Sequence, residues 1–178
     1  LVNIIEKIVN RSNCTELRLE HMNERFETQR LLGKTLLTAK DVKSNFLNTA
    51  GAHKLKALTG KDTLSIEHKG SNESYDICGV FNAIITSNST LRVSLDGDKE
   101  AWRRRILWVT YHTPPPNQIT DFDDYLLAKE GSGILNWAIE GAVKLLAANK
   151  KIKKSAEQNA KVEQPLHSSD AVSEFITN

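Results

Sequence analysis

Residues 34–41, Lys-Thr-Leu-Leu-Thr-Ala-Lys-Asp, decide the expected fold. Their apolar run from Leu36 to Ala39 ends at Lys40 and Asp41, which is typical of a buried strand with an acid at its carboxyl end. The strongest strand prediction is Val-Phe-Asn-Ala-Ile-Ile-Thr at 80–86, which the polar turn Ser-Asn-Ser at 87–89 follows. The sequence therefore predicts two apolar strands that each end in polar side chains.

Other elements are expected on both sides of these strands. Apolar residues at helical spacing predict an opening helix over 2–11 and a second helix near 16–26. Residues 44–58 are expected to be helical, with a break at Gly51 and a stop at Gly60. Downstream, the patterns predict a hairpin of 63–69 and 75–79 around a polar tip, a strand over 106–111, an amphipathic helix over 133–149, a polar linker over 150–167 and a short helix from Ser169 through Phe175.

Bulk composition fits one globular domain that needs neither disulfides nor metals. The chain has 178 residues, of which 39% are apolar and 26% charged. Cys14 and Cys78 have no CxxC partner, so both are expected to be free thiols in the core. Without an apolar run long enough for a membrane span or a signal-peptide pattern, a cytoplasmic protein is expected.

Charge alone does not indicate a nucleic-acid-binding protein, because the net charge is only +2. The distribution of basic residues is more informative than their number. They concentrate at 54–61, at His68 and Lys69, at 103–105 and at 150–154. Most runs of this kind are solvated faces, so each needs a structural context before it is assigned a role.

Gly33-Lys34-Thr35 resembles the end of a phosphate-binding loop, but its surroundings do not fit. The full pattern requires a glycine where Thr28 stands, and a helix after the motif. Here the residues after Thr35 are expected to form a strand. We therefore expect an ordinary loop that enters this strand.

The order of the polar parts matches that of a ring ATPase. An acid at a strand end (Asp41) is followed by a basic hairpin, a strand ending at Ser87-Asn88, and the triplet Arg103-Arg104-Arg105. An acid can hold Mg²⁺ or orient water, a polar side chain can contact the γ-phosphate, and an arginine can stabilise transition-state charge. No single part is specific, but their combined order is informative.

At these positions the chain resembles the superfamily 3 helicase domain of phage and plasmid primase-helicases, a branch of the AAA+ ATPases related to poxvirus-type helicases. The matching stretches are 26–37, 55–62 (Leu-Lys-Ala-Leu-Thr-Gly-Lys-Asp), 86–88 (Thr-Ser-Asn), 102–106 (Trp-Arg-Arg-Arg-Ile), 133–138 (Gly-Ile-Leu-Asn-Trp-Ala) and 168–175.

The resemblance implies an α/β fold with an AAA+-like core around a mostly parallel sheet. Residues 1–149 would form the motor domain, 150–167 a polar linker, and 168–178 the start of a C-terminal region. The helix at 1–10 would follow a phosphate-binding loop located upstream of Leu1. The 178 residues alone are therefore expected to be inactive, whereas the intact protein would hydrolyse ATP with Mg²⁺.

The resemblance also assigns roles to individual residues. Asp41 would coordinate Mg²⁺ or polarise the attacking water, although Lys40 stands where family members often carry a second acid. Asn88 would be the sensor that contacts the γ-phosphate. The alternatives are that Asp41 caps a following helix and that Asn88 is a plain turn residue.

One of the three arginines would act in trans on the neighbouring subunit's nucleotide, and Arg105 or Arg104 is preferred over Arg103. An inter-subunit salt bridge is the alternative for each of them. His68 and Lys69, near the hairpin tip, would grip the phosphates of single-stranded DNA. Lys54 and Lys56 are weaker candidates for the same contact.

Together these features imply an ATP-driven DNA helicase of a phage or plasmid replication protein in a bacterial host. It would act as a homo-oligomeric ring, with six subunits expected, and a primase is a candidate partner. One rival interpretation is an inactive replication module that binds DNA or recruits primase, which Lys40 beside Asp41 favours. The other is an ordinary α/β domain whose basic runs are an interaction surface.

Overall fold

The computed structural model describes residues 1–67, 70, 74–93 and 99–168. Its centre is a parallel sheet of three strands in the order β1-β2-β5, with β1 at Cys14–Glu16, β2 at Leu36–Ala39 and β5 at Asn82–Ile85. Leu36 pairs with Cys14 on one side and with Asn82 on the other. All four residues of β2 are buried, as the apolar run predicts for a central strand.

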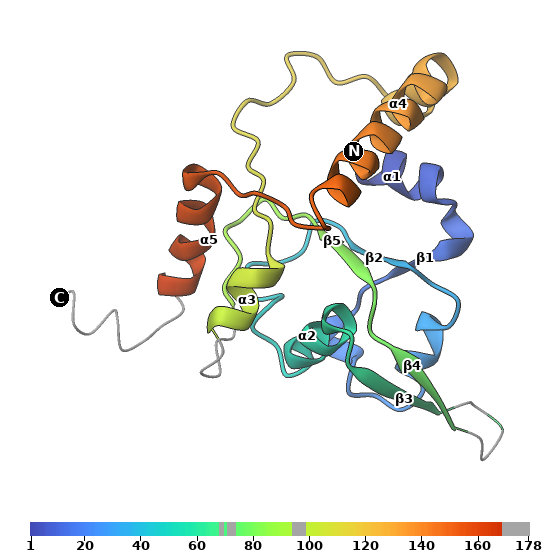
Figure 1. The fold of residues 1–178 in the computed structure, drawn as a ribbon, viewed down its shortest axis with the longest axis vertical. Coiled ribbons are helices and arrows are strands. Elements are labelled where there is room, and N and C mark those ends of the chain that lie inside the picture. The colour runs from blue at the N-terminus through green and yellow to red at the C-terminus, as the bar shows by residue number, and fades with distance from the viewer. Residues whose placement is uncertain (68–69, 71–73, 94–98, 169–178) are drawn as a thin grey trace.

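Helices and a separate hairpin surround this sheet (Figure 1). The helices are α1 at Val2–Val9, α2 at Ala52–Gly60, α3 at Lys99–Arg105, α4 at Phe122–Ala147 and α5 at Ala156–Ser168. Short 3-10 turns lie at Arg11–Asn13, Leu19–His21 and Glu27–Leu31. Strands β3 at Thr63–Glu67 and β4 at Ser74–Cys78 pair antiparallel. The chain is thus a mixed α/β protein with a small parallel sheet and C-terminal helices.

The hydrophobic core joins elements that are distant in sequence. Leu37 of β2, Leu58 of α2 and Trp102 of α3 are each at most 2% exposed and belong to one buried cluster. Val162 and Leu166 of α5 belong to the same cluster. The C-terminal helix α5 is therefore part of the core that supports the sheet.

Several sequence-based expectations are confirmed. The opening helix, the buried strand before Asp41, the strand before Ser87 and the two hairpin strands all form where the patterns place them. The helix expected over 133–149 also forms, but it begins earlier, at Phe122. The short helix expected from Ser169 lies outside the described residues.

Other expectations are wrong. The segment 16–26 is not a helix, because Leu17 and Leu19 are both buried although positions two apart would face opposite sides of a helix. Residues 44–51 form turns, and only the part after Gly51 is helical. No strand forms over 106–111, where Val109 and Tyr111 are well exposed. The expected linker contains α5, whose Val162 and Leu166 lie four residues apart on one helical face.

The two cysteines also differ from expectation. Both are free, but Cys14 is only partly buried and Cys78 is exposed, so neither is a core residue. Cys14 lies in the edge strand β1, and Cys78 ends the hairpin strand β4. Both β1 and β4 are edge strands of their sheets, so solvent reaches Cys14 in part and Cys78 more fully.

Candidate functional site

Asp41 and Asn88 meet at the carboxyl ends of two neighbouring parallel strands. Asn88 Nδ2 donates a hydrogen bond of 2.7 Å to Asp41 Oδ1. Both residues follow their strands, β2 and β5, which pair directly. Both side chains are exposed, so a ligand can reach this pair from solvent. The sheet therefore brings together the two polar residues that the sequence singled out 47 positions apart.

A small hydrogen-bond network holds together the two loops that carry this pair. Thr86 N donates to Ala39 O at 2.9 Å, and Val42 N donates to Thr86 O at 2.9 Å. Asp41 N donates to Thr86 Oγ1 at 3.1 Å, and Ser87 Oγ donates to Val42 O at 2.8 Å. Because main-chain and side-chain bonds both cross between the loops, the distance between Asp41 and Asn88 is set by the framework rather than by their own contact alone.

Asp41 has a backbone conformation that L residues rarely adopt. Its φ is 51°, in the left-handed region, where a non-glycine residue costs on the order of 1 kcal/mol. The residues after it form turns, and the next helix begins only at Ala52 with Gly51 at its N-cap position. The alternative that Asp41 caps a following helix is therefore excluded.

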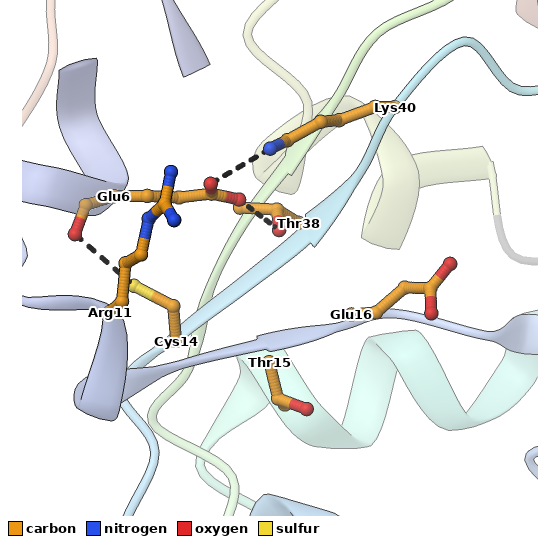
Figure 2. A pocket seen from close by; sticks show the side chains of 7 residues that line it. All are labelled: Glu6, Arg11, Cys14, Thr15, Glu16, Thr38 and Lys40. Atoms are coloured by element: carbon orange, nitrogen blue, oxygen red, sulfur yellow. Dashed lines mark hydrogen bonds and ion pairs between the residues drawn. The ribbon is translucent and has the colours of Figure 1, made fainter. Parts of the chain in front are cut away.

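A second polar group, which includes Lys40 next to Asp41 in sequence, lies between α1 and the sheet (Figure 2). Lys40 Nζ donates to Glu6 Oε2 at 2.8 Å and to Asn3 Oδ1 at 2.8 Å. Thr38 Oγ1 donates to Glu6 Oε1 at 2.7 Å. Glu6 is 8% exposed, so its carboxylate is buried but fully engaged. The ammonium of Lys40 is thus held on α1 and neutralises Glu6.

This group borders a pocket of about 450 Å³, which Figure 2 shows from close by. The lining residues are Glu6, Arg11, Cys14, Thr15, Glu16, Thr38 and Lys40. Burial raises the pKa of Glu6, but the hydrogen bonds from Lys40 and Thr38 outweigh it and lower that pKa below 4.5. Burial also raises the pKa of the Cys14 thiol, and the nearby Glu6 charge adds to this rise. Glu6 is therefore charged near neutral pH and Cys14 is a thiol.

Asp41 offers a carboxylate of the kind that Mg²⁺ accepts when it is bound together with a nucleotide. Such ions are commonly held by one or two carboxylates plus substrate phosphates and water. In the described part of the chain, no group of three or more His, Cys, Asp or Glu side chains could hold a metal on its own. Asp41 alone could therefore supply one carboxylate ligand to such an ion.

The three arginines of α3 have different surroundings. Arg103 pairs with Glu100 and with Glu163 of α5. The Arg105 guanidinium packs against Gly60 and donates from Nη1 to Ala101 O at 3.0 Å, while its Nε is buried without a partner among the described residues. Arg104 is exposed. Of the two arginines preferred from the sequence, Arg105 is held by its bond to Ala101 O, whereas Arg104 is exposed and can reach another molecule.

The candidate DNA contacts fall into three groups. His68 and Lys69 lie outside the described residues, although β3 and β4 carry the hairpin away from the sheet (Figure 1). Lys54 Nζ donates to Met22 O at 2.6 Å, so this lysine is bound internally. Lys56 is partly buried on the same helix. The base of the hairpin packs on the core, since Ile66 of β3 is 0% exposed and Leu64 and Ile77 contact the core cluster.

The Gly33-Lys34-Thr35 motif lies in a turn that enters β2, as expected. Lys34 Nζ donates to Ser12 O at 2.6 Å, and Thr35 N donates to Asn13 O at 2.9 Å. A strand rather than a helix follows, so the amides do not form a cradle at a helix N-terminus. The motif therefore has a structural role: it connects the turn before β2 to residues 12 and 13.

Sequence reasoning did not find Glu6. Its only signal was an acidic residue within the apolar stripe of the opening helix, between Ile5 and Ile8, where burial is expected. A carboxylate placed there needs a partner, and Lys40 at the end of a buried strand is a suitable one. The pairing follows once α1 is known to pack on β2.

The fold and the strand-end pair define an α/β protein with a polar site at the carboxyl edge of a parallel sheet. The chain belongs to the family of unknown function DUF5906, whose family model matches residues 1–105. No curated protein matches the chain significantly. Among the described residues, no helix combines the length and apolar character needed to cross a membrane.

Proposed function

We propose that this chain is part of an ATP-hydrolysing DNA helicase motor of a phage or plasmid replication protein, with a superfamily 3, AAA+-like core. The single observation that carries the proposal is the hydrogen bond between Asp41 and Asn88 at the ends of adjacent parallel strands. In open α/β sheets, ligands bind at the carboxyl ends of the strands. An acid and an amide held together there suit a phosphate and its attacking water.

Each residue has a defined task in this proposal. Asp41 accepts a hydrogen bond from Asn88 on one oxygen and offers its carboxylate to the nucleotide-bound Mg²⁺ or to the attacking water. Asn88 presents its amide to the γ-phosphate. Mg²⁺, when bound, would neutralise charge on the phosphates. Arg104, exposed on α3, supplies a positive charge to the nucleotide of the neighbouring copy.

Two requirements lie beyond these residues. The motor needs a phosphate-binding loop, which the family resemblance assigns to residues ahead of Leu1 and which the Gly33 turn does not supply. Translocation needs a DNA contact, for which the resemblance offers His68 and Lys69 at the end of the β3–β4 hairpin. Contacts of this kind act on the phosphate backbone and are insensitive to sequence.

The test is ATP hydrolysis by the complete gene product with and without single-stranded DNA. Asp41→Asn and Asn88→Ala should each lower turnover by about 100-fold or more, the range found when a group that stabilises transition-state charge is removed. Asn159→Ala, which changes an exposed asparagine of α5, is the matched control and should hydrolyse ATP normally. Near-normal turnover in both site variants would remove the proposed site.

A second candidate function is a replication module without ATPase activity that binds DNA or recruits primase. The observation that favours it is the Lys40–Glu6 ion pair, because a cation stands next to Asp41 in sequence where a second acid would help to hold Mg²⁺. DNA binding by a complete protein that does not hydrolyse ATP would select this function over the motor.

A further inference from the structure

In the part of the chain that the structure describes, helix α4 is half-buried along one side and exposed elsewhere. Its N-terminal half contacts α1 (Figure 1), and Lys7 Nζ of α1 pairs with Asp123 Oδ2 at 2.7 Å. The half-buried positions of the helix itself are Asp123, Leu126, Leu127, Gly131 and Ile134. All residues from 135 to 149 are exposed, and no residue of the helix is buried. A helix of 26 residues thus leaves most of its surface in solvent.

The free side of α4 carries a regular apolar seam. Its positions alternate in steps of three and four and are Tyr125, Ala128, Ser132, Leu135, Ile139, Ala142 and Leu146. At 3.6 residues per turn, these positions share one stripe, on the side of the helix away from the half-buried positions. Leu135, Ile139 and Leu146 are 45%, 51% and 61% exposed. Spacing of this kind is the seam of a two-stranded coiled coil, in which small residues let the backbones approach.

We propose that the seam binds the same seam of a second copy of this chain, with the two α4 helices antiparallel. The charges decide the orientation. The N-terminal end carries Asp121, while Asp123 and Asp124 pair with Lys7 of the same chain, and the C-terminal end is followed by Lys150 and Lys151. An antiparallel pair brings acidic and basic ends together and opposes the two helix dipoles, while a parallel pair would bring like charges together.

The sequence is also self-complementary about Leu135. Tyr125 and Leu146 lie at nearly equal distances on either side of it, as do Asp121 and Lys150. A two-fold axis next to Leu135 therefore places Tyr125 beside the partner's seam end at Leu146, and Asp121 beside Lys150. One patch serves both copies, as a two-fold contact requires.

The contact is expected to be reversible. The seam runs for about 32 Å, so one helix pair buries less than the roughly 800 Å² per partner of a standard interface. Small contacts of this kind are commonly weak and transient, and we expect dissociation in the micromolar range. The contact is two-fold, unlike the head-to-tail contacts of a ring, so the proposed nucleotide site does not depend on it.

Sedimentation of the purified 178-residue chain over about 1–300 μM tests the proposal, since this range brackets a micromolar equilibrium. The wild type should pass from monomer to dimer. Leu135→Glu and Ile139→Glu should each raise the dissociation constant at least about tenfold, because a charge replaces a central apolar contact. Both side chains are exposed in the monomer, so folding should be preserved, which circular dichroism checks.

The matched control is Trp137→Glu on the same helix. Trp137 is 76% exposed but lies off the seam, so the same change of chemistry should leave the dimer intact. A wild type that stays monomeric at all concentrations would overturn the proposal, and so would seam variants that dimerise as well as the wild type.

The orientation has its own test. In an antiparallel pair, Asp121→Lys alone and Lys150→Asp alone should weaken the dimer several-fold at low salt, and the double variant should restore it. In a parallel pair, position 121 faces 121 and position 150 faces 150, so each single variant only exchanges one pair of like charges for another and the double variant should restore nothing. That result would overturn the antiparallel arrangement.

Discussion

Glu27 shows how a single carboxylate holds an irregular part of the chain. It is 6% exposed and pairs with Arg18 and with Arg30, the latter at 2.7 Å. Arg30 also donates to Thr15 Oγ1 at 3.4 Å, so Glu27 connects the 3-10 turns to strand β1. The residues between β1 and β2 have little regular backbone pairing, so the Glu27 cluster of side chains holds this segment in place instead.

Glu27→Ala should destabilise the protein by about 1–3 kcal/mol. Removing one partner from a buried pair leaves the other charges uncompensated, but both guanidiniums are a third or more exposed, so solvent screens part of the loss. Urea unfolding measures the change. Glu24→Ala is the control, since Glu24 is 63% exposed, and its effect should stay within about 0.5 kcal/mol.

Stability should fall in acid because of Glu6 and Glu27. Burial raises the pKa of each, but hydrogen bonds from their cationic partners outweigh it, so each pKa lies below 4.5 in the folded protein. A lowered pKa contributes stability that is complete above the unfolded value and is lost as pH falls through the folded value.

Unfolding free energy measured from about pH 7 to pH 3 should therefore decline below about pH 5, and Glu27→Gln should flatten that decline. The exposed variant Glu24→Gln should follow the wild-type curve. An identical acid slope in the wild type and Glu27→Gln would show that this carboxylate does not contribute.

The placement of side chains was predictable from sequence where they directly follow a strand. Asp41 and Asn88 stand directly after apolar runs, and the carboxyl ends of parallel strands meet at one edge. The Glu6–Lys40 pair was not predictable, because it depends on which face of α1 packs on the sheet. The arginine surroundings depend in the same way on α5, which supplies Glu163.

At the scale of elements, periodicity succeeded where a segment buries one continuous face. It failed at 16–26, where Leu17, Leu19 and Met22 are buried along an extended and then turning backbone. It also failed at 106–111, because a strand needs a neighbour to receive its backbone hydrogen bonds. Pattern alone does not reveal whether that neighbour exists.

Close approach of elements gives a prediction at Gly79. A Cβ there would lie 2.0 Å from Ala57 O of helix α2, so the hairpin end can pass the helix only without a side chain. Gly79→Ala should destabilise the protein by about 1–3 kcal/mol, as overpacking commonly does. Thermal unfolding measures this loss.

The matched substitution Gly141→Ala should have the opposite sign. A Cβ at Gly141 meets no atom within 4 Å, and the residue lies inside the exposed part of α4. Alanine should stabilise the helix by about 0.5–1 kcal/mol. Circular dichroism should then show that the variant retains more helix than the wild type at each temperature during heating. Equal effects of the two alanines would contradict the packing described around Gly79.

At the scale of the whole molecule, the strand ends of the sheet carry the polar pair, while α3 and α4 each expose side chains to solvent. The strand order β1-β2-β5 puts Asp41 and Asn88 side by side, while Arg104 on α3 is exposed. The proposed motor uses the exposure of Arg104, since one copy would supply the strand-end pair and a neighbouring copy the arginine. When two copies share a site, mixing two variants that are inactive alone can restore an intact site, which is impossible for a site within one chain.

The most direct measurement is therefore ATP hydrolysis by mixtures of two inactive variants of the complete gene product, Asn88→Ala and Arg104→Ala. Each alone should lose about 100-fold or more of its turnover. Mixed assemblies should regain a measurable share, because some interfaces then combine an intact Asn88 with an intact Arg104. Absence of ATP hydrolysis by the wild type, or mixtures no more active than the separate variants, would contradict the account.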